Sequence, residues 1–255
     1  MSFMGKEIEE AFETTSGVVL GRKLSVLDDY TEWLGRYTDA DPIRAKSAVS
    51  TNTVYAANTF FYRSVKKNMV KLDESLQLGE RKIDREMIGK LTLSNAGQIL
   101  SGIKYTTPEG IVEPNIGMEE CTLYGYCSYC YKATAMVETK YSAFSFWPRQ
   151  SEYVFGCRYC FSSKFCINCY YSVNLTRCFE MLDCNNCSDS YFCHNSEGLS
   201  NCMFCFNSKS LRYAIGNVEV GKEEYVRVKK ILLDAIGKQL EKDKDLKLSI
   251  YNLRV

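Results

Sequence analysis

Two Cys-x-x-Cys pairs start nine residues apart in the stretch CRYCFSSKFCINC, residues 157–169. Four thiolates from two such pairs can bind zinc tetrahedrally, and soft thiolates also suit Cu(I) or an iron–sulfur cluster. The same thiols could instead form disulfides between neighbouring strands or fill a core as small side chains. Because the chain has thirteen cysteines, an odd number, a complete intramolecular disulfide framework is excluded.

The cysteines recur with a nine-residue period between Cys121 and Cys205. When the sequence is cut every nine residues from Cys157, Cys dominates positions one and four, and position five is often aromatic or apolar. The frame extends back to Cys121 and onward to Glu219, and only Cys127 falls outside it. A short fixed period with small residues at fixed positions is typical of a solenoid.

Nine residues suit one side of a flat β-coil, with a strand of ~3–4 residues and a turn supplied by Asn, Asp, Ser or Gly. Two such sides would make a coil of about 18 residues, and coils would stack at ~4.8 Å. Positions one and four then face a narrow interior, where a small and readily buried residue such as Cys fits. The period therefore predicts two interior ladders: Cys166, Cys184 and Cys202 in one, and Cys169, Cys187 and Cys205 beside it.

Metal binding is the alternative to core packing. The second pair follows the first after only five residues, fewer than in zinc fingers and ribbons, and the same positions also take Leu175 and Ala214. If a site exists, neighbouring rungs predict its ligands to be Cys184, Cys187, Cys202 and Cys205. No cofactor is expected, and zinc is the one that the pattern leaves open.

Composition divides the chain into three parts and predicts an α+β fold. Residues 1–117 contain no Cys and are predicted to form a mixed, mainly helical N-terminal domain that ends in a turn-rich segment. Residues 118–220 are predicted to form the Cys-rich β-solenoid, with two nine-residue sides per coil. In residues 221–255, a capping helix at 222–241 is followed by a terminal strand, whose alternating apolar residues could pair with a neighbouring subunit.

The end of the repeat reads NCMFCFNSKSLRYAIGNVEVGKEEYVRVKKIL, residues 201–232. Its Asn201–Cys205, Leu211, Tyr213–Asn217 and Lys222–Tyr225 resemble the end of an uncharacterised Cys-rich nonapeptide-repeat family of tailed phages and uncultivated bacteria. The resemblance covers about residues 150–235, and the chain departs from the family at Ala214, where a Cys is common, and at Asn207-Ser208, where Gly-Cys is common. The resemblance implies a β-solenoid and a phage setting.

No catalytic residue is predicted. His194 is the only histidine, and its neighbour Cys193 should point to the opposite face of a strand, so the two form no Cys–His dyad. The sequence contains no phosphate-binding Gly-rich loop and no Gly-x-Ser-x-Gly motif. The chain is therefore expected not to be an enzyme.

Charge and hydropathy restrict the partners and the location. A net charge of +1 gives no general attraction to nucleic acid, which is expected only through the basic stretch RSVKKNMVK, residues 63–71. No apolar run approaches the roughly 20 residues of a membrane span, so no membrane contact is expected. The acidic N-terminus lacks the pattern of a signal peptide, which predicts a location in the host cytoplasm or in a virion.

Three functions compete at this point. The favoured one is a structural or assembly protein that forms a homo-oligomer or larger assembly, such as a capsid-associated component of a phage virion. The second is a thiolate protein that binds zinc or an iron–sulfur cluster. The third is a carbohydrate-binding β-helix, which the eighteen Tyr residues favour.

Overall fold

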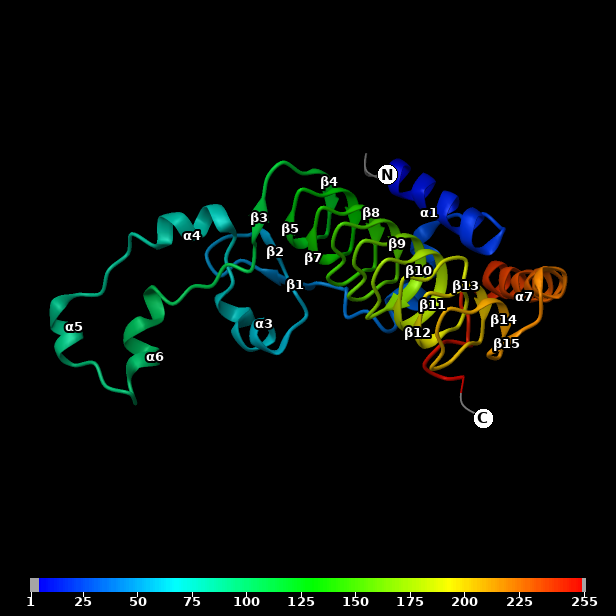
Figure 1. Cartoon of the computed structure of the whole chain (residues 1–255). Helices are drawn as coiled ribbons and strands as arrows, with labels where there is room; N and C mark the ends of the chain where they lie inside the picture. The colour runs from blue at the N-terminus through cyan, green and yellow to red at the C-terminus, as the bar shows by residue number, and fades with distance from the viewer. Residues whose placement is uncertain (1–4, 254–255) are drawn as a thin grey trace.

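The structure, a computed structural model, describes residues 5–253 and shows a rod-shaped β-solenoid with helices on one flank and a lobe at one end (Figure 1). Apart from β15, each solenoid strand pairs in parallel with a strand of the coil before or after it. The largest sheet consists of β4 (Ile116–Glu119), β6 (Ser128–Tyr131), β8 (Lys140–Ala143), β9 (Glu152–Phe155), β10 (Lys164–Tyr170), β11 (Thr176–Asn185) and β12 (His194–Glu197). The other solenoid strands are β3 (Ile111–Val112), β5 (Thr122–Gly125), β7 (Thr134–Val137), β13 (Ser200–Met203), β14 (Arg212–Ile215) and the antiparallel β15 (Val218–Glu219).

Each coil contains 12 residues. Lys140 pairs with Glu152, and Glu152 pairs with Lys164, which fixes the offset between coils at 12. The same offset holds from Ile116 to Arg212, so nine coils stack along the rod. The predicted α+β fold with a β-solenoid is confirmed, but the prediction of two nine-residue sides per coil is wrong.

A left-handed backbone residue at every third position explains the short coil. From Gly117 to Gly216, every third residue has φ between 43° and 66°. Each of these residues turns the chain, and four three-residue sides close a coil of 12. Most of them are not glycine and include Tyr, Phe and Trp, for which this conformation costs roughly 1–2 kcal/mol per residue. Contacts between coils must offset that cost.

Backbone hydrogen bonds join each side of a coil to both of its neighbours. The Lys140 N–H donates to the Ser151 carbonyl in the following coil (3.0 Å), and the Phe144 N–H donates to the Tyr131 carbonyl in the preceding coil (3.2 Å). The same two bonds recur around the solenoid. Backbone hydrogen bonds between coils therefore stabilise the left-handed residues on every side of the coil.

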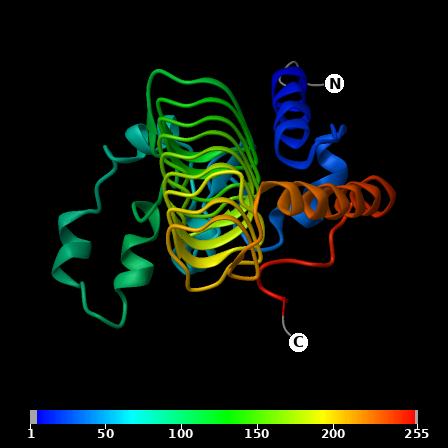
Figure 2. The same cartoon turned by 45° about the vertical axis from the view of Figure 1, so that its right-hand side comes forward.

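Helices cover one apolar flank of the rod (Figure 2). That flank presents a column at the coil offset, which consists of Ala143, Phe155, Ile167, Phe179, Tyr191 and Met203. Against it pack α1 (Gly5–Leu20), η1 (Leu27–Tyr30), α2 (Thr31–Gly35) and α7 (Lys222–Asp243). The ring centroids of Phe12 on α1 and Phe155 lie 5.3 Å apart, so helices and solenoid share one core. The division predicted at residues 117/118 stays a prediction.

The C-terminal end of the rod is capped by side chains. The Asn217 amide accepts a hydrogen bond from the Phe206 N–H and donates one to the Phe206 carbonyl, both at 2.8 Å, as a further coil would. The predicted C-terminal helix is confirmed as α7, whose Tyr225 hydroxyl donates to the Asp189 carbonyl (3.0 Å). Coiled sheets expose unpaired edges at their ends, so this cap removes a template for strand addition.

The predicted terminal strand is wrong. Residues 244–253 form bends and turns that fold back on the chain's own solenoid, with Leu246 and Ile250 buried. The Tyr251 ring packs against Tyr37 (4.7 Å between centroids) and Tyr170 (5.0 Å). Leu246, Ile250 and Tyr251 therefore serve packing within the chain.

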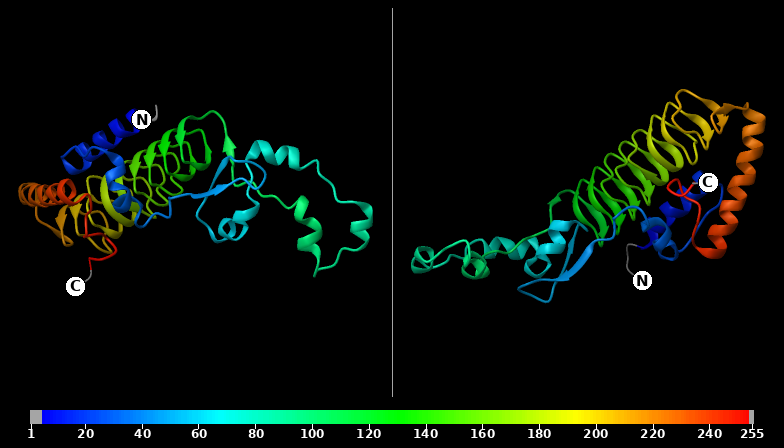
Figure 3. Two further views of the ribbon diagram at one scale, coloured as in Figure 1. Left: turned by 180° about the vertical axis from the view of Figure 1, so that it is seen from behind. Right: turned by 90° about the horizontal axis from the view of Figure 1, so that it is seen from below.

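Residues 43–105 form a lobe at the N-terminal end of the rod (Figure 3). It contains the antiparallel hairpin β1 (Ile43–Lys46) and β2 (Thr53–Ala56), then α3 (Phe60–Val65), η2 (Lys66–Asn68), α4 (Leu72–Leu78), α5 (Arg85–Gly89), α6 (Ala96–Ile99) and η3 (Leu100–Gly102). Its core is small and centres on Val54, Ala56 and Met69. Residues 79–104, here called the arm, extend away from the rod, and none of them is buried.

Gly156 offers a test of how the helical flank is fixed to the rod. A Cβ at Gly156 (φ +65°) would meet the Asn168 Oδ1 at 2.2 Å and the Leu34 carbonyl oxygen at 2.9 Å. We expect Gly156→Ala to lower the free energy of unfolding by roughly 2–4 kcal/mol, measured by urea denaturation. Gly198→Ala is the matched control, because it shares the positive φ (+66°) but finds no atom closer than 3.7 Å. Equal losses in both variants would contradict the proposed clash.

Candidate functional sites in the solenoid

The interior of the solenoid is lined by every third residue. All thirteen cysteines lie in this frame, including Cys127, which the nine-residue period left out. The other interior positions are mostly small, and Ser is the commonest after Cys, so the frame selects small side chains. The thiols therefore line the narrow interior along the rod axis, here called the bore, and all thirteen are free thiols.

Interior Cys and Ser both donate to the carbonyl two residues earlier, and the Ser hydroxyl also accepts from a backbone N–H in the next coil. The Cys184 Sγ donates to the carbonyls of Leu182 and Cys193, both at 3.3 Å. The Ser172 Oγ donates to the Tyr170 carbonyl (2.8 Å) and accepts from the Cys184 N–H in the next coil (3.1 Å). An interior position thus suits a small side chain that can donate to a backbone carbonyl, which explains why Cys and Ser share these positions.

The predicted cysteine ladders are wrong because the coil has 12 residues and not 18. Cys166 pairs with Cys178, and a further two coils lead to Cys202, so Cys166 and Cys202 do share a column. Cys184 pairs with Ser196 in a different column. The same shift separates Cys187 from the column of Cys169 and Cys205.

The four predicted metal ligands lie on different sides of two successive coils. Cys184 and Cys187 occupy two adjacent sides of one coil, and Cys202 and Cys205 occupy the other two sides of the next. Within residues 5–253, no three or more His, Cys, Asp or Glu side chains are grouped so that they could hold a metal ion. A zinc site at these four thiols stays a prediction.

Burial disfavours the thiolate at the cysteines of the first coils, whereas hydrogen bonds from neighbouring thiols lower the pKa values of Cys187 and Cys205. Desolvation raises the pKa of Cys121 to about 12 and also raises the pKa values of Cys127 and Cys130. Since the thiolate is the nucleophile and the metal ligand, these groups are poorly prepared for either role. Cys193 is buried in the interior, whereas the neighbouring His194 is partly exposed.

Glu180 is a buried ionisable group that no motif in the sequence singles out. Its carboxylate accepts hydrogen bonds from the Asn168 Nδ2 (3.0 Å) and from the Ile250 N–H of the C-terminal segment (2.8 Å). Burial raises the pKa of Glu180 to about 8, although these donors and the charge of Arg36 act in the opposite direction. Glu180 therefore ties the C-terminal segment to the solenoid near neutral pH.

A patch of aromatic and apolar side chains lies on a side of the rod that the helices leave uncovered. This aromatic patch consists of Trp147, Tyr159, Phe161, Tyr171 and Val173, and four of these residues line a shallow hollow of about 360 Å³. The rings of Trp147, Tyr159 and Tyr171 follow one another at centroid distances of 5.5 and 5.1 Å. Tyr159 and Tyr171 stack on each other. The guanidinium group of Arg149 lies 5.1 Å from the Trp147 ring centroid and that of Arg158 lies 5.3 Å from the Tyr159 centroid, so few ring faces are left on which a sugar could stack.

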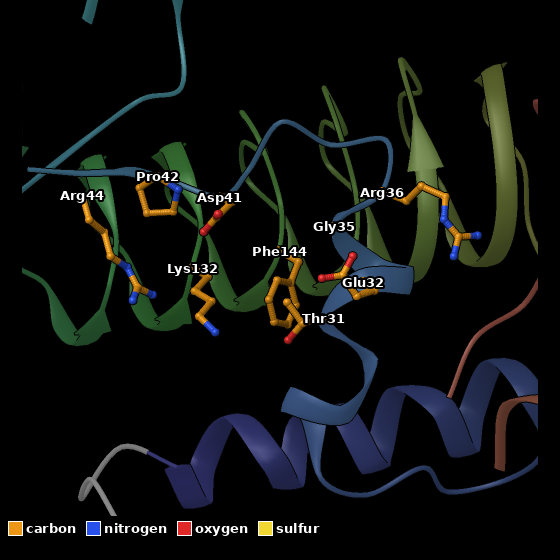
Figure 4. Close-up of a pocket in the computed structure, with 9 residues that line it drawn as sticks. All are labelled: Thr31, Glu32, Gly35, Arg36, Asp41, Pro42, Arg44, Lys132 and Phe144. Atoms are coloured by element: carbon orange, nitrogen blue, oxygen red, sulfur yellow. The ribbon is translucent and has the colours of Figure 1, made fainter. Parts of the chain in front are cut away.

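A cleft of about 560 Å³ lies between the segment after α2 and the solenoid (Figure 4). It is lined by Thr31, Glu32, Gly35, Arg36, Asp41, Pro42, Arg44, Lys132 and Phe144. Each of its three cations has an acidic partner: Arg36 pairs with Asp245, Arg44 with Glu120, and Lys132 with Asp28 (3.4 Å). Ion pairs therefore connect the two walls of the cleft or neutralise its cations. None of the three cations that line it is free to attract an anionic ligand.

Comparisons with family models, curated proteins and solved structures found no match for this chain. In the part of the chain that the structure describes, no helix combines the length and the apolar character needed to cross a membrane. The functional argument therefore depends on the geometry of this chain alone.

The interior hydrogen bonds predict how cysteine substitutions behave. Cys184→Ser should change the free energy of unfolding by less than about 1 kcal/mol, because Ser makes the same bonds in the neighbouring coils at Ser172 and Ser196. Cys184→Ala should cost about 2–3 kcal/mol, since it leaves a cavity and removes both hydrogen bonds of the thiol. Urea denaturation of both variants measures the difference. A Ser variant as unstable as the Ala variant would show that sulfur itself is required.

Glu180 predicts a pH dependence of stability. Its pKa is raised in the folded state to about 8, so the folded chain binds its proton more tightly than the unfolded chain. The stability that this proton provides is complete below about pH 4.5 and is lost as the pH rises through about 8. Glu180→Gln should flatten the decline of the thermal midpoint between about pH 5 and about pH 9. The exposed Glu197→Gln is the control, and an unchanged slope in Glu180→Gln would refute the assignment.

Proposed function

We propose that this chain is a non-enzymatic structural protein that assembles with copies of itself, with the solenoid as a rigid spacer. The observation that carries the proposal is the arm, residues 79–104, in which no residue is buried. Its exposed apolar side chains are Met87, Ile88, Leu91, Leu93 and Ile103. Its helices α5 and α6 span only five and four residues, too few to be stable alone in water. The arm therefore needs a partner that covers it.

The rod is suited to the role of a spacer. Its coils are joined on every side by backbone hydrogen bonds, and its interior thiols and hydroxyls bond to backbone groups in their own and neighbouring coils. The conspicuous cysteines thus contribute to the stiffness of the rod, and the proposed role requires no cofactor. A location in a phage virion or in the host cytoplasm is the setting that the resemblance of residues 150–235 favours.

The proposal predicts self-association. Sedimentation of the whole chain at micromolar concentrations should give a mass above 29.2 kDa that rises with concentration. Raising the salt concentration should change the assembly only modestly, because the groups of the arm that need to be covered are its exposed apolar side chains. A chain that stays at 29.2 kDa throughout the concentration range would refute the proposed function.

A further inference from the structure

We propose that the exposed face of α3 and η2 binds single-stranded nucleic acid. This basic face consists of Phe60, Phe61, Arg63, Lys66 and Lys67, all of which are exposed. It lies in the lobe, at the end of the rod opposite α7 (Figure 1). The binding is a further activity of the lobe and does not depend on the self-assembly proposed above.

The segment that carries the basic face contains no acidic residue. Residues 43–71 hold six Lys or Arg and no Asp or Glu, a net charge of +6, whereas the rest of the chain holds 26 Lys or Arg and 31 Asp or Glu, a net charge of −5. The first acidic residues after the segment are Asp73 and Glu74. Glu74 accepts hydrogen bonds from the Ser47 Oγ (2.6 Å) and the Asn52 Nδ2 (3.1 Å), so it is bound to the hairpin turn. Such a separation of charge along one chain indicates a polyanionic partner.

The cations of the basic face are free to bind phosphate. Of the six cations in residues 43–71, two form ion pairs within the described residues 5–253, and both of these lie outside the basic face. The Arg63 guanidinium donates to the Asn58 Oδ1 (2.9 Å), a neutral acceptor that leaves the positive charge uncompensated. Three cations therefore remain for a partner of opposite charge.

Two phenylalanine rings lie beside these cations. Phe60 is 79 % exposed and Phe61 is 55 % exposed. Phe60, Arg63 and Lys67 follow one another at spacings of three and four residues, which place them on one side of the helical turns. A nucleotide fits this arrangement, because its base can stack on a ring while its phosphate binds a cation. In a duplex the bases are already stacked on one another, so the rings favour a single strand.

The other side of α3 fixes the basic face to the fold. The Thr59 Oγ1 accepts from the Tyr62 N–H (3.5 Å) at the start of the helix. Tyr62 and Val65 pack against the small core of the lobe. The Asn68 carbonyl accepts from the Thr106 N–H (2.9 Å), which connects η2 to the segment that enters the rod. The rings and cations are therefore presented by a supported element.

An anionic membrane surface is the other partner that cations and apolar side chains attract. Interfacial helices bury a broad apolar face, whereas α3 has six residues and its exposed large apolar side chains are the two adjacent rings. Nucleic acid is therefore the partner that the geometry favours.

Fluorescence anisotropy with the whole chain tests the proposal. The probes are labelled oligo(dT) and oligo(U) of about 15 nucleotides, a duplex of the same length, and vesicles that contain phosphatidylserine. The ring variant carries Phe60→Leu and Phe61→Leu, which remove the stacking surface and keep the apolar character. The charge variant carries Lys66→Gln and Lys67→Gln.

The matched control carries Lys222→Gln and Lys230→Gln, which remove the same charge from exposed positions of α7. All of the side chains that are changed in these variants are exposed, and circular dichroism checks that each variant keeps the solenoid.

We expect the unmodified chain to bind single strands with a dissociation constant in the micromolar range at low salt. The logarithm of the binding constant should fall with the logarithm of the salt concentration with a slope of about −2, as three phosphate contacts require. The ring variant should raise the dissociation constant at least about tenfold and leave the slope unchanged. The charge variant should weaken binding and reduce the slope to about −0.7, while the control changes neither quantity.

Three results would each overturn the proposal: no binding of either oligonucleotide up to about 100 μM, a duplex bound as tightly as the single strands, or a ring variant that binds like the unmodified chain. Binding of vesicles without binding of oligonucleotides would overturn it in favour of a membrane surface. Binding of oligo(dT) or oligo(U) alone would support the proposal and identify the sugar. None of these outcomes changes the sedimentation result on which the proposed function depends.

Discussion

The left-handed residue at every third position is the constraint on which the rest of the structure depends. It turns the chain after each three-residue side, so that four sides close a coil, and it directs every third side chain into the bore. The conformation is unfavourable for Tyr, Phe and Trp, and it persists because two hydrogen bonds per side tie each coil to its neighbours. Single coils of this kind would not be stable, whereas a stack shares the cost among many contacts.

The bore accounts for the composition of the chain. With four inward side chains per coil, there is room only for small groups, and backbone carbonyls and amides of neighbouring coils point toward them. Cys and Ser satisfy both requirements, and Leu175 or Met181 appears where volume matters more than hydrogen bonding. The cysteine content, which first indicates metal chemistry, is thus a consequence of steric and hydrogen-bonding demands inside a narrow coil.

The solenoid, its buried cysteines and the C-terminal helix could be predicted from the sequence. They depend on the period of the cysteines and on the spacing of apolar residues, and both are visible in the sequence itself. The nine-residue period misjudged the coil, because nine and twelve are both multiples of three and the Cys-x-x-Cys spacing fits either. Cys127, outside the nine-residue frame but inside the three-residue frame, was the signal that separates the two. Glu180 and the aromatic patch could not be predicted, since both depend on which residues share a column, and columns require the correct coil length.

The 12-residue coil also makes the rod a modular length. A duplication or deletion of 12 residues within the solenoid would change the rod by one coil, about 4.8 Å, and leave every column in register. A change of three residues would instead rotate everything beyond it by one side, so that the helical flank and the aromatic patch would no longer align with their columns. The length of such a rod can therefore change only by whole coils, so solenoids of this kind would differ in length in steps of one coil.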